Sequence, residues 1–304
     1  MAVDVSSRRA AIPGQSMSWL TARLEHFAPG SPGVSRHALT KRCTELAIIT
    51  AYVRAWVADG SLPAQPFAAH ADAWREALQA HCEAPGQARL ALGDGDQGLY
   101  HAQPYLWLRA GGYRLRSWEE ALAGLSERGA RPRSVGVLHC LWKAGLVRSE
   151  PDWRTALKRW LAAWGDQPAA RDRDAYRVSH AAFYVTDFGC QEPPVERRDR
   201  ARLENLAVEL LGRAVEQERW DLVGELLIAL ECLDRLGPPH EGATCAFEAG
   251  WQPDDGTGAV AFRRHHHTVM VDVLRCVGVS RGRRHTQGRR HTQGTRRPDR
   301  AARA

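Results

Sequence analysis

The sequence predicts an all-α protein made of stacked helical hairpins. Apolar residues recur at helical spacing along most of the chain, and short turns rich in glycine and proline separate these segments. The composition is that of a globular protein, with 44% hydrophobic residues and 11 tryptophans against 6 phenylalanines and 6 tyrosines. Large flat side chains are therefore expected to fill the space between the helices.

The helices expected in the first half of the chain have start or stop signals. Ser16 or Ser18 can cap the first helix, and Gly60 ends the second. Ser117 and Glu120, the first and last residues of the sequence SWEE, form a capping box at the start of the fifth helix. These helices are expected at residues 16–27, 35–59, 64–84, 104–110 and 117–128.

The second half continues the same pattern up to residue 279. Trp153, Trp160 and Trp164 form one stripe on a helix, which favours core packing and leaves an aromatic ligand wall as the alternative. Leucines alternate with Arg and Glu in one later helix, and a largely apolar helix follows it. The helices are expected at residues 132–145, 152–165, 176–189, 197–217, 220–236 and 265–279.

The chain divides into a flexible leader at residues 1–15, a single all-helical domain at 16–279 and a disordered, arginine-rich tail at 280–304. The last 24 residues hold nine arginines and one aspartate, a net +8 against a formal charge of +7 for the whole chain, so the rest carries −1. A nearly neutral body argues against a nucleic-acid-binding surface on the domain. The tail alone, with GRRHTQ twice, could bind nucleic acid non-specifically.

Cysteine usage and the N-terminus both favour a cytoplasmic protein. The seven cysteines are dispersed and include no CxxC pair, as in proteins of a reducing compartment. The N-terminus has no apolar segment of signal-peptide length, and no window approaches a membrane span. No membrane partner is therefore expected.

The candidate site lies on the helix predicted from Tyr176 onward. At about 100° per residue, Tyr176, His180, Tyr184 and Asp187 fall within one arc that carries no lysine or glutamate, so this arc is expected to face a cavity. We expect His180 to act as an acid/base and Asp187 to orient or charge it. The alternative is a buried structural pair satisfied by backbone groups and tyrosine hydroxyls.

A second candidate lies in the run RRHHHT at the start of the last helix. His267 is the expected cavity residue of this run, as a second proton donor or a partner for an oxyanion, because the following apolar residues place it on the buried side. The alternative is a set of partly exposed histidines at a helix end. Tyr176, Tyr184 and Trp251 are the expected substrate contacts.

Metal binding is the least supported expectation. Asp187, Cys190 and His267 form a conceivable zinc set, but the sequence offers no fourth ligand and Gly189 separates the first two. We therefore expect no cofactor, with zinc as the alternative.

Two resemblances add to this interpretation. The segments LHCLWKAGL and SHAAFYVTDFG, with the late HHT before a helix, resemble a family of actinobacterial all-helical proteins of unknown activity, some of them encoded among antibiotic-biosynthesis genes. More distantly, the succession of helix pairs, with GWQPDDG and a His-Thr helix start, is similar to the α/α toroids of terpene cyclases, protein prenyltransferases and lanthionine-forming cyclases. That likeness implies a full or partial toroid with its active site in a central cavity.

The functional hypothesis is an accessory enzyme of bacterial specialised metabolism, acting on a small-molecule or peptide substrate by acid/base chemistry in a helical cavity. The rival hypothesis is a non-catalytic helical-repeat protein that binds a partner or serves as a scaffold, in which the same residues form a satisfied polar core. The residues alone do not decide between an enzyme and a binding protein.

Overall fold

The computed structural model describes residues 14–31, 33–93, 97–127, 134–164, 172–253, 256 and 258–294, and the elements in this part of the chain are all helices. Residues 14–21 are helical and are followed by a short 3-10 helix, η1. The further elements are η1 (Leu24–Phe27), α2 (Arg36–Ala58), α3 (Ala64–Glu83), α4 (Gln87–Gly93), α5 (Gly98–His101), α6 (Gln103–Ala110), α7 (Arg116–Glu127), α8 (Val135–Lys143), α9 (Trp153–Trp164), α10 (Asp172–Val185), α11 (Arg197–Glu216), α12 (Trp220–Cys232), α13 (Pro238–Gly250) and α14 (Ala259–Gly294). The predicted all-α class is confirmed.

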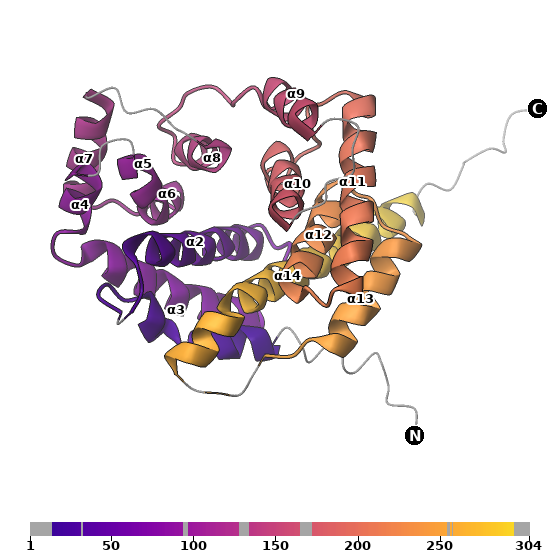
Figure 1. Cartoon of the computed structure of the whole chain (residues 1–304), viewed down its shortest axis with the longest axis horizontal. Coiled ribbons are helices and arrows are strands. Elements are labelled where there is room, and N and C mark those ends of the chain that lie inside the picture. The colour runs from indigo at the N-terminus through magenta and orange to yellow at the C-terminus, as the bar shows by residue number, and fades with distance from the viewer. Residues whose placement is uncertain are drawn as a thin grey trace, which may run out of the picture.

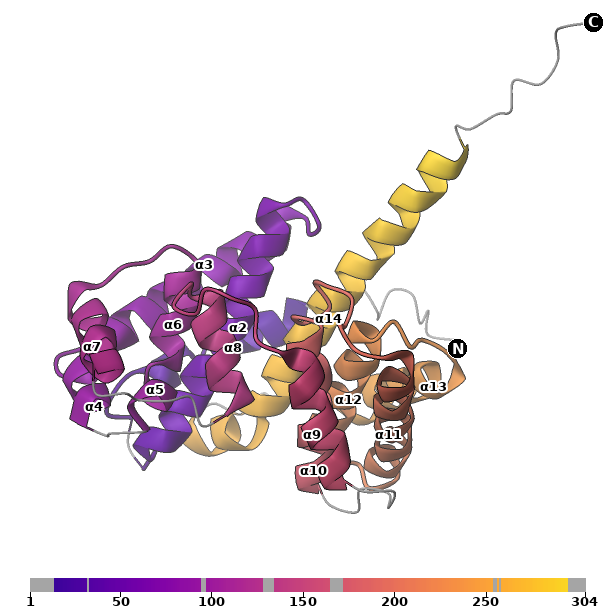
Figure 2. The same cartoon turned by 90° about the horizontal axis from the view of Figure 1, so that it is seen from above.

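The helices form two groups that α14 joins. Helices α2 to α8 lie on one side of Figure 1 and α9 to α13 on the other, while α14 crosses between them. Helix α14 packs against α2 in the first group and against α12 in the second. Figure 2 shows its C-terminal part extending beyond the body of the molecule.

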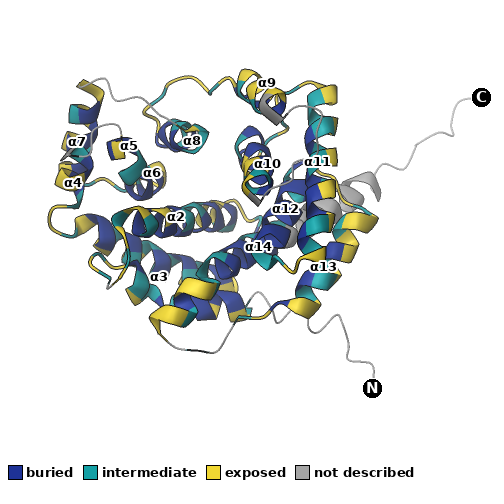
Figure 3. Cartoon of the chain, viewed as in Figure 1, coloured by how far each residue is buried: buried dark blue, intermediate teal, exposed yellow. Residues whose placement is uncertain are grey.

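Helix α12 is deeply buried. Every residue from 222 to 230 is buried, and the helix packs against α10, α11, α13 and α14 (Figure 3). Gly224 allows the close approach of α14, since a Cβ atom there would lie 2.4 Å from Cγ1 of Val271. This apolar helix also carries one carboxylate, Glu225, which is 4% exposed.

Most predicted helices match observed ones within two or three residues, and the differences have physical causes. The sequence predicts no helix between residues 237 and 258, yet α13 begins at Pro238, because proline is well tolerated in the first turn of a helix. Helix α10 ends at Val185 rather than at Gly189. Helix α14 continues to Gly294, through part of the expected disordered tail, in a stretch without proline.

The ends of the chain fall largely outside this description. Residues 1–13 of the expected leader and residues 295–304 of the expected tail lie outside the described residues. Within the described ranges, no helix combines the length and apolar character needed to cross a bilayer.

Candidate functional site

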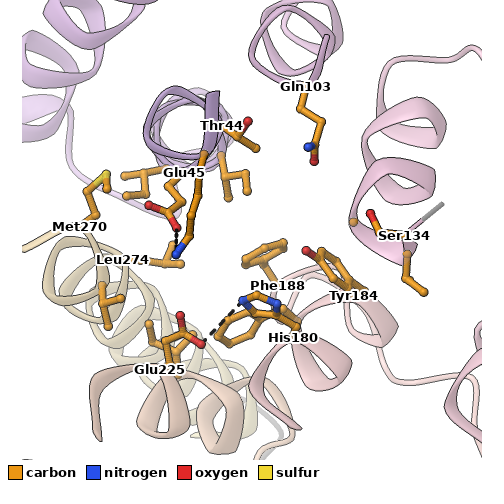
Figure 4. A pocket seen from close by; sticks show the side chains of 18 of the residues that line it. Thr44, Glu45, Gln103, Ser134, His180, Tyr184, Phe188, Glu225, Met270 and Leu274 are labelled. Carbon is orange, nitrogen blue, oxygen red and sulfur yellow. Dashed lines mark ion pairs between the residues drawn. The ribbon is translucent and has the colours of Figure 1, made fainter. Parts of the chain in front are cut away.

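A cavity of about 660 Å³ lies where the two groups of helices meet α14. Its walls come from α2, α5, α6, the start of α8, α9, α10, α12 and α14, and from the turn that follows α10. Much of the wall is apolar, including Ile48, Ile49, Phe183, Phe188, Ile228 and Met270. Charged side chains gather at one part of it, as the labelled residues in Figure 4 show.

The centre of the charged part is His267, which lies between two carboxylates. Its Nδ1 atom is 3.5 Å from Oε1 of Glu45, and its Nε2 atom is 3.2 Å from Oε1 of Glu225. Burial lowers the pKa of His267, but the two carboxylates outweigh this effect and raise it to about 10. His267 is therefore a fixed cation at neutral pH.

The two carboxylates are kept ionised in turn. Burial raises the pKa of Glu45, but His267 and Lys41 outweigh it and bring that pKa to about 2. Burial likewise raises the pKa of Glu225, and the neighbouring histidines with Ser179 lower it overall. A carboxylate as deeply buried as Glu225 is tolerable because an ion pair and a hydrogen bond from the Ser179 hydroxyl compensate for lost hydration.

His180 faces the cavity beside Glu225. Its Nε2 atom is 3.7 Å from Oε2 of Glu225, and its side chain is 46% exposed (Figure 4). This distance is longer than a hydrogen bond, and the ring is half exposed, so His180 can contact a ligand in the cavity. His180 and His267 therefore both contact the carboxylate of Glu225. Both histidines are expected cavity residues, whereas this carboxylate is not among the expected site residues.

Asp187 belongs to a different cluster. Its Oδ1 atom accepts hydrogen bonds from the Tyr52 hydroxyl at 2.6 Å and from Nε2 of His139 at 3.0 Å, and its Oδ2 atom accepts one from Nζ of Lys143 at 2.7 Å. Burial raises the pKa of Asp187, but His139 and Lys143 outweigh it and hold that pKa well below its usual range. The carboxylate joins α2, α8 and the end of α10, and it does not line the cavity.

The backbone explains why Asp187 leaves the arc of His180. Helix α10 ends at Val185, and the next turn has φ values of 48° at Asp187, 54° at Phe188 and 77° at Gly189. Three consecutive residues in the left-handed region break the helical phase, so spacing of seven no longer means a shared face. The turn sends Phe188 into the cavity wall and Asp187 to the buried cluster.

The expected substrate contacts divide in the same way. Tyr184 lines the cavity, with its ring centroid 5.9 Å from that of His180. The Tyr176 ring packs at a tilted angle beside the rings of His180 and His267, but its hydroxyl donates to Oδ2 of Asp221 at 2.5 Å and it does not line the cavity. Trp251 packs on Phe247, with 5.3 Å between the ring centroids, and it also does not line the cavity.

The sequence interpretation missed the two carboxylates that organise the site. Glu45 lies within CTELAII and Glu225 within LVGELLIAL, each an isolated acid in an apolar helical stretch. Burying a carboxylate is costly unless it is paired, so an acid in such a stretch signals a buried partner. That signal was present in the sequence for both.

The conceivable zinc set does not assemble. Asp187 and His267 belong to separate clusters, and among the described residues no three His, Cys, Asp or Glu side chains converge in a way that could hold a metal ion.

Fold and site together define an all-α protein with a cavity open to solvent, whose wall is largely apolar and carries a buried carboxylate–imidazole cluster. Residues 14–277 match the model of a domain of unknown function, DUF6895, and the chain belongs to that family. No curated protein and no solved structure matches it.

Proposed function

We propose that this protein is an enzyme that admits a small, largely apolar molecule to the cavity and transfers a proton through His180. The observation that carries the proposal is the position of His180, half exposed in the cavity and 3.7 Å from a buried carboxylate. An imidazole beside a carboxylate is a common acid/base arrangement.

The size and lining of the cavity support a small molecule in preference to a peptide. About 660 Å³ falls within the range of pockets that bind drug-sized ligands, and the apolar side chains that make up much of the wall match the usual character of such pockets. The apolar wall also strengthens electrostatic interactions along it, because apolar side chains lower the local dielectric constant.

The other members of the cluster support His180 without exchanging protons. Glu225 is ionised and held by the Ser179 hydroxyl and His267, so it can stabilise the imidazolium that forms when His180 accepts a proton. His267 is a permanent cation between two carboxylates, and its role in this proposal is to keep Glu225 ionised and in place. Asp187 has no part in the chemistry.

The wider setting is part of the same proposal. The chain would serve as an accessory enzyme of actinobacterial specialised metabolism, such as antibiotic biosynthesis, in the cytoplasm, without a required metal. The ring of helices around the cavity is compatible with a partial α/α toroid.

Turnover of small molecules tests this proposal. Purified protein would be incubated with a bacterial small-molecule extract, and mass spectrometry would follow which components are consumed. His180→Gln should reduce consumption by about 100-fold or more, as expected for loss of a general acid/base. Because the His180 side chain is 46% exposed, its replacement should change the free energy of unfolding by less than about 1 kcal/mol.

His240 provides the matched control. It forms a similar ion pair, 3.1 Å from Glu231, but does not line the cavity, so His240→Gln should leave consumption unchanged. If wild-type protein retains a compound without altering it, the non-catalytic binding hypothesis replaces the enzyme.

A further inference from the structure

Among the polar side chains that line the cavity, Tyr184 carries a hydroxyl that the chemistry above does not use. Tyr184 follows His180 by one helical turn on α10, and both side chains lie along the cavity wall (Figure 4). Two other polar side chains of the wall have partners within the protein: Ser134 Oγ accepts from the Val137 N–H, and Gln103 Nε2 donates to the Tyr100 carbonyl. The Tyr184 hydroxyl has no hydrogen-bond partner among the residues that the structure describes.

The position of this hydroxyl depends on a glycine in the facing helix. A Cβ atom at Gly136, in the first turn of α8, would lie only 2.6 Å from the Tyr184 oxygen. Any side chain at that position would displace the hydroxyl. The close approach therefore fixes the tip of Tyr184 against α8, where it borders the cavity.

The protonation state makes this group a donor. Burial raises the pKa of Tyr184, and nearby acidic groups raise it further, so the hydroxyl keeps its proton at neutral pH. An O–H group with no partner in an apolar wall gains most from an acceptor that the ligand brings.

We propose that Tyr184 donates a hydrogen bond to a carbonyl oxygen of the substrate, whose adjacent carbon exchanges a proton with His180. The substrate class is thus an apolar molecule that bears a ketone or a related carbonyl. This inference rests on the proposed function, because it assigns the substrate of the same site.

The chemistry balances without any co-reactant. A neutral ring nitrogen of His180 takes the proton from the carbon next to the carbonyl, and the electron pair of that C–H bond forms a carbon–carbon double bond. The carbonyl π pair moves to oxygen, where the Tyr184 hydroxyl stabilises the developing charge. Return of the proton to the same or a conjugated carbon gives exchange or isomerisation.

The test uses 1-indanone and indane, which share an apolar body and differ in the carbonyl. Wild-type protein should bind 1-indanone more tightly than indane, and the carbonyl stretching frequency of bound 1-indanone should fall on binding. Exchange of the protons next to the carbonyl with D₂O, followed by NMR, should be accelerated. Tyr184→Phe should abolish the frequency shift and slow exchange by about tenfold or more.

Two further variants separate the possible outcomes. Gly136→Ala should reproduce the loss in Tyr184→Phe, whereas Tyr113→Phe, whose hydroxyl donates to Glu83 outside the cavity, should behave as wild type. If His180→Gln stops exchange while Tyr184→Phe has no effect, the proposed function stands and this inference is wrong. If the frequency shift occurs without exchange, the hydrogen bond stands and the proposed function fails.

Equal binding of the two compounds, or no binding of 1-indanone up to its solubility limit, would overturn the assignment of a carbonyl substrate.

Discussion

Replacement of Asp187 by alanine should strongly destabilise the folded protein, although it removes no group that takes part in the proposed chemistry. The side chain is 9% exposed and accepts hydrogen bonds from three groups, two of them on α8. Removing one partner of a buried ion pair typically costs about 3–5 kcal/mol, because the remaining charge loses its compensation. Lys143 is 28% exposed and can regain contact with water, so we expect a loss of about 3 kcal/mol.

Urea unfolding followed by circular dichroism measures this loss. Asp72 is the control, because it forms an ion pair with Arg54 in which both side chains are more than 40% exposed, and Asp72→Ala should cost about 0–1 kcal/mol. A loss below about 1 kcal/mol for Asp187→Ala would refute the reasoning, since removing one partner of a buried ion pair leaves the other charge uncompensated.

The same carboxylate predicts a dependence on pH. The pKa of Asp187 is lower in the folded protein than in the unfolded chain, so its contribution is present above about pH 4 and is lost as the pH falls toward the folded-state pKa. The difference in unfolding free energy between wild type and Asp187→Ala should therefore be constant from about pH 5 upward and shrink in more acidic buffer. A difference that does not change below pH 4 would contradict the assigned ionisation.

Two other perturbations test the packing and charge around the cavity. Burial lowers the pKa of His267, but its carboxylate neighbours raise it to about 10, so its stabilising charge is fully present below about pH 6.5 and is lost toward pH 10. The stability difference between wild type and His267→Gln, from urea unfolding, should shrink across that interval, and a difference that grows would disprove the assigned cation. Gly224→Ala should cost about 1–3 kcal/mol through overlap with Val271, whereas Gly212→Ala, with nothing within 4 Å, should stabilise by about 0.5–1 kcal/mol. Equal effects of the two alanines in thermal unfolding would show that α12 and α14 are not so closely packed.

The fold class could be predicted because it depends on local patterns. Apolar spacing, the serine caps and the glycine stops gave helix bounds such as Arg36–Ala58, found one residue inside the expected range at each end. Helix α13 escaped prediction, because Pro-Pro after Gly237 can either end one helix or begin another. Which of the two occurs depends on packing against α11 and α12, which the local sequence does not encode.

The candidate site could be predicted only as far as the helix remained regular. His180 and Tyr184 share the cavity as their spacing indicates, since both precede the end of α10. Asp187 does not, because left-handed backbone at Asp187 and Phe188 is uncommon for residues other than glycine, and local propensity does not predict it. The partners Glu45 and Glu225 lie 180 residues apart, and only the folded chain reveals that both reach His267.

The crossing of α14 between the two groups of helices has a consequence for how the protein reaches its native state. The cavity needs α2, from the start of the chain, and α14, the last described helix, so neither group can enclose it alone. Contacts of such large sequence separation form late, because the loop-closure entropy must be overcome first. During synthesis the apolar residues of α2 and α12 must wait for α14 to emerge, and the nascent chain is then most exposed to aggregation and to chaperones.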